Sequence, residues 1–129
     1  MPNQDLPGFD TPRLARAIEQ LPATAIDTLP FGVIRLDAEG RVTLYNATER
    51  RLSGYRGTVL GESFFGVIAP CMDNEEFRGR IDAARTAGRL DIAFGYVSDM
   101  PGGQRNVALD IRVQSAADGG VWVFLQREA

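Results

Sequence analysis

Two groups of strand patterns, separated by a long stretch without one, limit the folds open to this chain. The first group is a hairpin, in which Gly32–Asp37 and Arg41–Tyr45 lie on either side of a turn whose Gly40 supplies a positive φ. The second group has three strands, separated by turns rich in Gly, Pro, Asp and Ser and predicted at 90–98, 104–114 and 121–126. Because short turns join antiparallel strands, we expect one five-stranded antiparallel sheet.

A short helix is predicted near the N-terminus. Thr11 is the expected N-cap, Pro12 the first helical residue and Pro22 the stop signal. The helix has one apolar stripe, formed by Leu14, Ala17, Ile18 and Leu21. Because an isolated helix of this length is marginal in water, it must pack on the rest of the protein, from which it could undock. We therefore predict an N-terminal helical cap over residues 1–28.

The segment between the two strand groups is predicted to hold the remaining helices. Residues 46–70 favour short helices and loops. A longer helix is expected to begin after Asp73 as its cap and to run to about Ala87, with Gly88 after it. The order of two strands, helices and three strands predicts an α+β fold over residues 29–129, with helices on one face of the sheet.

Size and charge exclude several classes of protein. The chain has 129 residues, which suits one domain, and its net charge of −3 argues against a nucleic-acid partner. No apolar run reaches the roughly 20 residues of a membrane span, and the N-terminus lacks the pattern of a secretory signal. We therefore expect a cytoplasmic protein with no membrane partner, as a monomer or weak dimer.

The chain contains one cysteine, Cys71, and no histidine. A single cysteine cannot form an internal disulfide, and without histidine it lacks the partner of a cysteine hydrolase and a common metal ligand. We therefore predict no metal site. The remaining roles for Cys71 are a covalent anchor, a redox-active thiol and an inert buried residue, and the residue pattern leaves all three open.

A tyrosine, a glutamate and a serine are predicted to share one face where the second strand leads into a helix. Tyr45 ends the strand and Asn46 is the expected N-cap, which places Glu49 at N3 and Ser53 one turn later. Taken singly, Glu49 also fits the reciprocal partner in a capping box with Asn46. Tyr45 likewise fits a half-buried aromatic residue at a strand end.

Several segments in this order together resemble the photoactive yellow protein family of small PAS-fold blue-light receptors. The most specific are Tyr-Asn-Ala-x-Glu at 45–49 and Phe-Phe-x-x-x-Ala-Pro-Cys at 64–71. The similarity also includes residues 29–37, 61–65, 76–77 and 121–124. It covers residues 29–127, and the first 28 residues only in their helical character. The resemblance implies a PAS domain with an N-terminal helical cap.

The resemblance also implies a chromophore, p-coumaric acid (4-hydroxycinnamic acid), bound to Cys71 as a thioester. It assigns Tyr45 and Glu49 as hydrogen-bond partners of the phenolic oxygen, with Ser53 supporting Tyr45 where the family usually has threonine. It assigns further residues to the chromophore site, namely Ile34, Tyr55, Phe64, Ala69, Pro70 and Tyr96. Glu49 can donate only when protonated, and burial beside another anion would enforce this by raising its pKa.

The expected function is that of a blue-light photoreceptor and not of an enzyme. Light isomerises the chromophore and Glu49 then gives its proton to the phenolate, which leaves a carboxylate in a dry pocket. That cost is comparable with the stability of a small domain, so a segment with few contacts can open. The helix at Pro12–Leu21 is the candidate, which makes the signalling state partly unfolded and reversible. The expected partner is a downstream signalling protein whose identity is unknown.

Two regions depart from the family pattern. Where the family commonly has an arginine over the ring, this chain has Tyr55 followed by Arg56. Further on, Ser98 and Met100 replace aromatic residues, and Gly102 stands where the family often has the methionine that assists the dark return. We therefore expect slow recovery of the dark state.

Competing hypotheses come from other classes of protein. A haem-binding PAS sensor would need an axial histidine, and a flavin-binding photosensor would need its cysteine in a helix, whereas Cys71 follows a proline in a loop. A redox thiol would need a cationic neighbour, but the nearest charges are acidic. An enzyme is the least supported, since no nucleophile–base pair accompanies Tyr45 and Glu49. A plain PAS interaction module with an inert Cys71 stays open.

Overall fold

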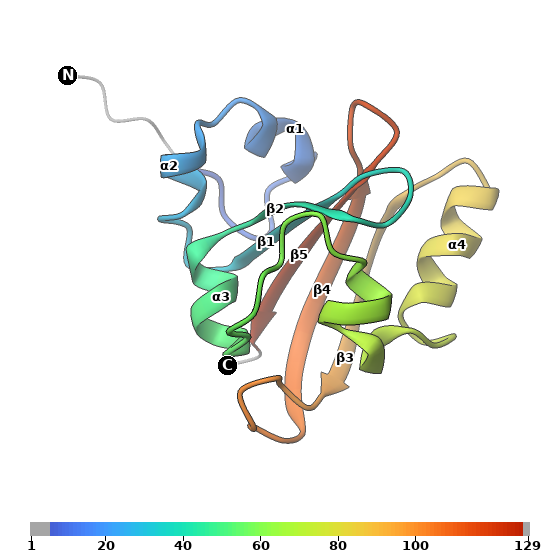
Figure 1. Cartoon of the computed structure of the whole chain (residues 1–129). Helices are drawn as coiled ribbons and strands as arrows, with labels where there is room; N and C mark the ends of the chain where they lie inside the picture. Colours follow the sequence, from blue (N-terminus) through green and yellow to red (C-terminus); the bar gives the residue numbers. More distant parts are fainter. Residues whose placement is uncertain (1–5, 128–129) are drawn as a thin grey trace.

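A five-stranded antiparallel sheet forms the centre of the protein, in a computed structural model that describes residues 6–127 (Figure 1). The spatial order is β2-β1-β5-β4-β3, with bounds β1 Gly32–Leu36, β2 Val42–Tyr45, β3 Asp91–Ser98, β4 Val107–Ser115 and β5 Val121–Arg127. This confirms the predicted α+β fold and both strand groups. Residues 1–5 of the predicted cap and 128–129 of the predicted core lie outside the described residues.

The sheet has an apolar core on each face, because side chains alternate across a strand. On one face, Ile34 and Leu125 pack with the helical segments that follow β2. On the other, Val33, Trp122 and Phe124 pack against the N-terminal segment. The helices between β2 and β3 therefore cover one face, as predicted, while the N-terminal helices cover the opposite one (Figure 1). The boundary predicted at residue 28 falls between α2 and β1 and stays a prediction.

The N-terminal helix differs from the prediction at both ends. Helix α1 spans Leu14–Glu19. Arg13 adopts a left-handed conformation with φ 53°, so the helix begins after it and does not include Pro12. Thr11 does not cap it: the Thr11 hydroxyl oxygen accepts a hydrogen bond from the Gly8 backbone N–H at 2.9 Å. An unpredicted helix, α2 (Ala23–Ile26), follows Pro22, which stops one helix and precedes the next.

Hydrogen bonds attach the N-terminal segment to the sheet and to the turn after β4. The Trp122 indole N–H donates to Glu19 Oε2 at 2.9 Å, and the Ala117 backbone N–H donates to the same oxygen at 3.1 Å. The Gln114 side-chain oxygen accepts from the Ala15 backbone N–H at 2.7 Å. Arg112 donates to the Phe9 and Thr11 carbonyl oxygens. Side chains of β4 and β5 therefore hold the cap through groups on its backbone and through one carboxylate.

The helix after β2 agrees with the prediction. Helix α3 spans Ala47–Ser53, with Asn46 as its N-cap and Gly54 at φ 73° after its last turn. The Asn46 side-chain oxygen accepts from the backbone N–H of Glu49 and of Val33, both at 3.0 Å. One capping side chain therefore joins the helix start to strand β1, which places Glu49 beside that strand.

The predicted cap of the later helix is wrong, because the helix begins later and Phe77 occupies its N-cap position without a side-chain hydrogen bond. Helix α4 spans Arg78–Thr86, and the Asn74 side-chain oxygen accepts from the backbone N–H groups of Glu76 and Phe77. Asp73 instead forms an ion pair with Arg78 at 3.0 Å. Gly88 lies just after the helix at φ 80°, as predicted.

The start of β4 is also later than predicted. It begins at Val107 and not at Gln104, because Asn106 has φ 54° and its backbone N–H donates to the Asp99 carboxylate. The Gln104 carbonyl oxygen accepts from Met100 N–H and closes the turn. Residues 99–106 therefore form a loop that lies over one end of the sheet (Figure 1).

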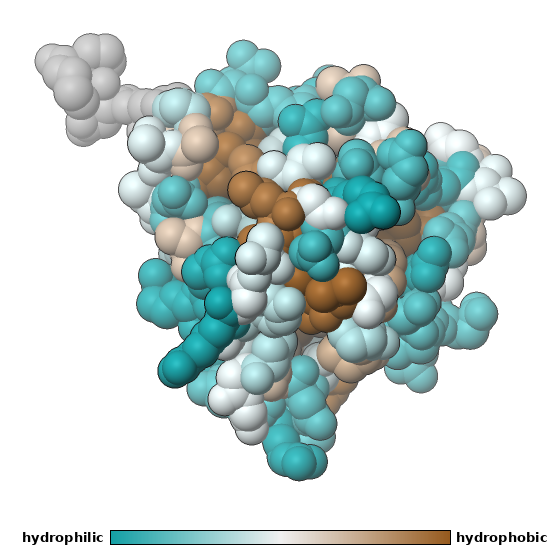
Figure 2. Space-filling model, viewed as in Figure 1, coloured by the Kyte–Doolittle hydropathy of each residue, from teal (hydrophilic) through white to brown (hydrophobic). Residues whose placement is uncertain are grey.

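On the side of the protein shown in Figure 2, apolar side chains reach the surface between hydrophilic ones. Over residues 6–127, the large apolar side chains with high exposure are Leu6, Leu60, Val67 and Val97. None of the helices within this range has both the length and the apolar character that a membrane span requires.

Candidate functional site

A small cavity of about 40 Å³, partly open to solvent, lies between the sheet, helix α3, the helical turns at 64–72 and the loop at 99–106. The two helical turns, Phe64–Ile68 and Pro70–Met72, lie next to each other, and residues of both line the cavity. The cavity brings together seven of the predicted site residues, namely Ile34, Tyr45, Glu49, Ser53, Phe64, Ala69 and Cys71.

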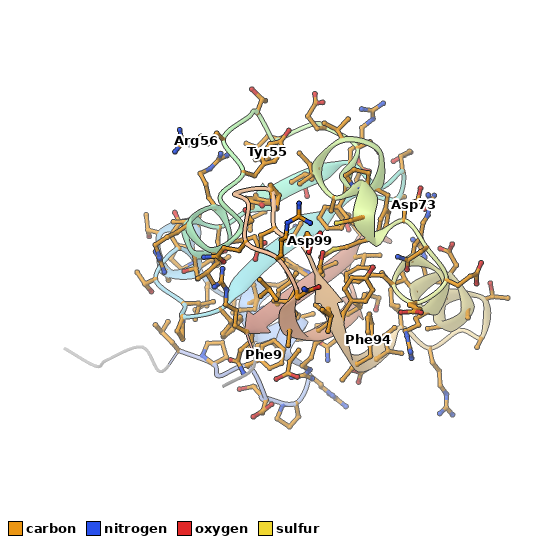
Figure 3. The ribbon with its side chains drawn as sticks, turned by 90° about the horizontal axis from the view of Figure 1, so that it is seen from below. Phe9, Tyr55, Arg56, Asp73, Phe94 and Asp99 are labelled. Atoms are coloured by element: carbon orange, nitrogen blue, oxygen red, sulfur yellow. The ribbon has the colours of Figure 1, made fainter. Side chains whose placement is uncertain are left out.

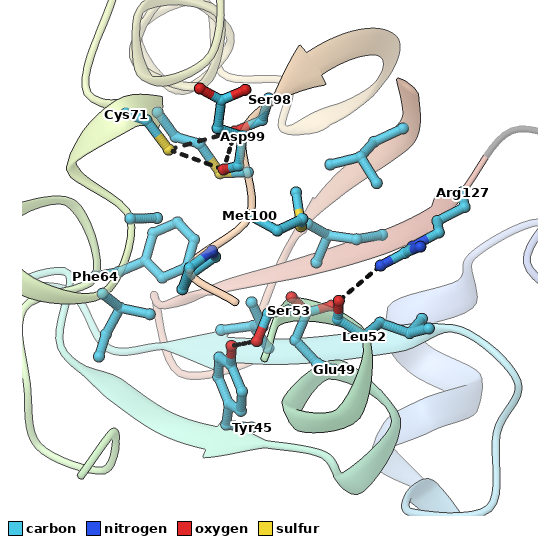
Figure 4. Close-up of a pocket in the computed structure, with 17 residues that line it drawn as sticks. Tyr45, Glu49, Leu52, Ser53, Phe64, Cys71, Ser98, Asp99, Met100 and Arg127 are labelled. Atoms are coloured by element: carbon cyan, nitrogen blue, oxygen red, sulfur yellow. Dashed lines mark hydrogen bonds between the residues drawn. The ribbon is translucent and has the colours of Figure 1, made fainter. Parts of the chain in front are cut away.

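Tyr45 and Ser53 form a hydrogen-bonded pair at one end of the cavity. The two side-chain oxygens are 2.9 Å apart, since β2 ends at Tyr45 and the last residue of α3 is Ser53 (Figure 4). Burial, together with the nearby charge of Glu49, raises the pKa of Tyr45 to about 12. Tyr45 is therefore a neutral phenol at physiological pH and can donate a hydrogen bond into the cavity.

Glu49 is a buried acid beside this pair. Only 8% of the residue is exposed, and burial raises the pKa of its carboxyl group to about 8, although the positive charge of Arg127 opposes this increase. In a capping box, the backbone N–H of Asn46 would donate to the Glu49 carboxylate. Here that N–H donates instead to the Val33 carbonyl oxygen at 3.0 Å. Glu49 is therefore protonated at neutral pH and is a second donor in the cavity.

Cys71 lies at the opposite end of the cavity (Figure 4). Its sulfur is 3.3 Å from Ser98 Oγ, and its carbonyl oxygen accepts hydrogen bonds from Tyr96 Oη at 2.8 Å and from Asn74 Nδ2 at 3.0 Å. The residue is a free thiol in an exposed turn. These contacts hold the backbone of Cys71 in place and leave its thiol at the cavity wall.

The other three predicted site residues lie outside the cavity lining. The Tyr96 hydroxyl donates a hydrogen bond to the carbonyl oxygen of Cys71, and Pro70 begins the turn that carries the thiol. Tyr55 donates from its backbone N–H to Ser53 Oγ at 3.2 Å, and its side chain lines a separate hollow with Arg56. Figure 3 shows Tyr55 and Arg56 at the outer edge of the protein. Tyr55 and Arg56, which stand where the family commonly has an arginine over the ring, therefore lie outside the cavity lining.

The sequence analysis missed Arg127 among the residues that line the cavity. Arg127 lies two residues after Leu125 on β5 and shares its face, because side chains of a strand repeat every second position. This periodicity was the available signal. Ser98 and Met100, which were identified as departures from the family pattern, also line the cavity, whereas Gly102 packs against Gly54 outside it.

The donors in this cavity suit a ligand with an acceptor at one end and an attachment to sulfur at the other. Most of the lining between the two ends is apolar, including Ile34, Phe64, Ile68, Leu109 and Leu125. Over residues 6–127, no cluster of three or more Cys, Asp or Glu side chains is placed to hold a metal ion. The arrangement therefore offers neutral donors for an anionic oxygen at one end and a thiol for covalent attachment at the other.

Comparisons with known proteins show the family and the fold of the chain. Residues 20–127 match the family described as the PAS fold. The chain is 35% identical to photoactive yellow protein of Rhodothalassium salexigens, over 92% of this chain and 95% of that one, and 33% identical to that of Rhodobacter capsulatus over the same shares. Among solved structures, it resembles the photoactive yellow protein domain of the sensor histidine kinase Ppr from Rhodospirillum centenum. That match has a TM-score of 0.77 and 34% identity, and covers 87% of this chain and 98% of the domain.

Proposed function

This chain belongs to the photoactive yellow protein family, and from that premise we propose that it is a blue-light photoreceptor that carries p-coumaric acid on Cys71. The observation that supports this most directly is the cavity that contains the Cys71 thiol, the Tyr45 phenol and the neutral, buried acid Glu49. A buried carboxyl group is costly to keep, and a chromophore with an anionic oxygen gives it a partner.

Cys71 would hold the chromophore as a thioester. An activated p-coumaroyl donor supplies the acyl group: the bond from Sγ to the acyl carbon forms, the bond to the leaving group breaks, and the leaving group departs with the thiol proton. Tyr96 and Asn74 hold the Cys71 carbonyl oxygen, so the thiol keeps its place at the cavity wall. This attachment needs no metal and no histidine.

Tyr45 and Glu49 would hold the phenolic oxygen of the chromophore. An anionic oxygen in an apolar cavity needs hydrogen-bond donors, and both residues are neutral donors at physiological pH. Ser53 accepts from or donates to Tyr45 at 2.9 Å and fixes the direction of the phenol. The bound chromophore supplies the absorption of blue light and the isomerisation of its double bond.

Glu49 would then release its proton to the phenolic oxygen, so that the O–H bond at its carboxyl group breaks and one forms on the phenol. The negative charge thereby moves to Glu49. A carboxylate in this cavity is disfavoured by several kcal/mol, which is a large share of the 5 to 15 kcal/mol that stabilises a small domain. Weakly held segments therefore open to let water reach the charge.

The segment that opens would include the N-terminal cap, residues 1–28. Its contacts with the sheet include the Glu19–Trp122 and Ala15–Gln114 hydrogen bonds, which can re-form when the charge leaves Glu49. The surface uncovered in this way would pass the signal to a downstream signalling protein. The Ppr domain is itself part of a sensor histidine kinase, which supports a signalling partner. The proposal includes no catalytic activity.

One preparation tests this proposal. The protein is produced together with an activated p-coumaroyl donor and examined by mass spectrometry and visible spectroscopy, with Cys71→Ser as the matched control. We expect one acyl group on Cys71, a visible band that bleaches in blue light and recovers in the dark, and neither in the control. A wild-type protein that stays unmodified and colourless would contradict the proposal and support a plain PAS interaction module.

The role of Glu49 is tested in the loaded protein with Glu49→Gln. The glutamine side chain still donates a hydrogen bond but has no proton to release. We expect a shifted dark absorption band and a photocycle that lacks the proton step. An unchanged band together with an unchanged photocycle would refute the assignment of Glu49.

A further inference from the structure

Arg127 brings a positive charge to the cavity wall, and no residue among 6–127 forms an ion pair with it. Its Nη2 group donates to the Leu52 carbonyl oxygen at 2.7 Å and to Gln104 Oε1, so its guanidinium group joins strand β5, helix α3 and the loop at 99–106. Over residues 6–127, its Nε atom is the one buried side-chain nitrogen or oxygen without a hydrogen-bond partner. A buried donor without a partner is costly, so its retention calls for an explanation.

Arg127 and Glu49 line the same cavity, and no ion pair joins them within the described part of the chain. Figure 4 shows the Arg127 side chain directed at helix α3, on the side of the cavity where Glu49 lies. A protonated Glu49 is neutral, so it supplies no counter-charge to the arginine from within the cavity. Ionisation of Glu49 would supply one.

Other charged or titratable groups face the same space. From β2, the Tyr45 hydroxyl points into the cavity, and Arg50 on α3 has its guanidinium carbon 5.7 Å from the centre of the Tyr45 ring. Cys71 and Asp99 line the cavity at the far end. Of the arginines, Arg127 lines the cavity directly, whereas Arg50 covers the outer side of the tyrosine ring.

We propose that Arg127 is a positioning residue that stabilises the Glu49 carboxylate once this residue has given up its proton. The consequence under light rests on the proposed function, whereas the pairing of the two side chains does not. An opposite charge within a few ångströms favours the ionised form of a carboxyl group, and a low-dielectric cavity strengthens this effect. Arg127 thereby increases the fraction of Glu49 that is ionised after proton release.

The pairing is tested first in the unloaded protein. The pKa of Glu49 is measured by NMR on protein with ¹³C-labelled glutamate carboxyl groups, in the wild type, Arg127→Gln, Arg127→Lys and Arg105→Gln. Arg105 is an exposed arginine of the neighbouring loop, so its replacement changes the net charge equally. We expect Arg127→Gln to raise the pKa of Glu49 by about one unit, and the Lys and Arg105 variants to leave it near the wild-type value.

Two results would overturn the inference. One is a Glu49 pKa that does not change in Arg127→Gln. The other is an equal shift in Arg127→Lys, which would assign the effect to lost hydrogen bonds and not to charge.

A second measurement needs no substitution of Arg127 and remains valid if Arg127→Gln fails to fold. The Arg127 Nε–H resonance is followed by ¹⁵N NMR through the titration of Glu49, with Glu49→Gln as the control. We expect the resonance to shift with the midpoint of Glu49 in the wild type and to stay in place in the control. A resonance that does not respond in the wild type would overturn the inference.

The loaded protein gives the functional result. A one-unit rise in the pKa of Glu49 lowers the equilibrium constant for release of its proton about tenfold, so a smaller fraction of Arg127→Gln should accumulate in the light-induced state. The two hypotheses fail separately. A colourless wild type would refute the photoreceptor and leave the NMR result intact, whereas an unchanged Glu49 pKa in Arg127→Gln would refute only the role of Arg127.

Discussion

Gly32 lies directly against the carboxyl group of Glu49, so that a Cβ atom at position 32 would overlap Glu49 Oε1. Gly32 begins β1 and shares the cavity-facing side with Ile34, two residues later. The missing side chain lets helix α3 approach the strand closely enough to bury the acid. Glycine is needed here for space and not for backbone conformation, since Gly32 is not among the residues with positive φ.

The first prediction concerns this contact. Gly32→Ala should displace the Glu49 carboxyl group and destabilise the protein by about 1 to 3 kcal/mol, because an added methyl group in a packed interior forces its neighbours to shift. Denaturant unfolding measures the change. Gly8→Ala is the control, since a Cβ atom there meets nothing within 4 Å. Equal stability of the two variants would contradict the close contact.

The second prediction concerns the pH dependence of stability in the unloaded protein. The pKa of Glu49 is raised in the folded state to about 8, so the folded protein keeps a proton that the unfolded chain loses near its ordinary value of 4.5. This contribution is complete below the unfolded pKa and is lost as the pH rises through the folded one.

The free energy of unfolding should therefore fall, relative to Glu49→Gln, by up to about 1.4 kcal/mol per pH unit between roughly pH 5 and 8. Urea titrations of both proteins at several pH values measure the difference. A difference that stays constant across this range would show that Glu49 titrates normally.

The third prediction concerns the attachment of the cap. Burial alone would raise the pKa of Glu19, but hydrogen bonds from Trp122, Ala117 and Arg16 outweigh it and lower this pKa below its usual value. Glu19→Gln should therefore weaken the cap and speed hydrogen exchange of the α1 amides severalfold. Exposed Glu39 gives the control, Glu39→Gln, which should leave exchange unchanged. A wild-type exchange rate in Glu19→Gln would remove this carboxylate from the attachment.

The same carboxylate predicts the effect of acid on the cap. Because the pKa of Glu19 is lowered in the folded state, its contribution is present above the unfolded pKa and is lost as the pH falls through the folded one. Exchange of the α1 amides, corrected for the intrinsic rate, should increase in acid in the wild type and should change less in Glu19→Gln. An equal acid response in both proteins would argue against this role.

The fourth prediction concerns recovery in the dark. Met100 lines the cavity, whereas Gly102, which replaces the methionine of the family pattern, packs against Gly54 outside it. We expect the loaded wild type to recover slowly, over times longer than seconds, as measured from the return of its visible band. Recovery within seconds would contradict this prediction, and a slower return in Met100→Ala would then assign the acceleration to Met100.

Local patterns predicted most of the elements, and they failed where side chains of similar chemistry stood close together. Asn46 caps α3 as predicted, because its neighbours along the chain, Tyr45 and Ala47, have no side chain suited to cap the helix. At α4, Asp73 and Asn74 are neighbours with similar capping propensity. The nearby Arg78 engages Asp73 and leaves Asn74 to accept the hydrogen bonds before the helix. The sequence does not rank these two residues.

The candidate site shows the same division between local and long-range information. Cys71, Tyr45 and Glu49 were identified from their motifs, and their shared cavity follows from the fold. Arg127 was missed, because its importance depends on strand β5 lying between β1 and β4 and ending beside helix α3. The strand period places Arg127 on the face of Leu125, but its contact with helix α3 joins residues 75 positions apart, and no local pattern indicates that contact.

The sequence by itself determined the strand periodicity, the turns, the cap of α3 and the single thiol, since each depends on residues within a few positions of one another. Only the tertiary structure decided that Glu49 is a buried neutral acid and not a partner in a capping box. That outcome requires the space left by Gly32 and the apolar walls brought together from both strand groups. The ionisation of a carboxyl group depends on the solvent and charge around it, and these come from distant parts of the chain.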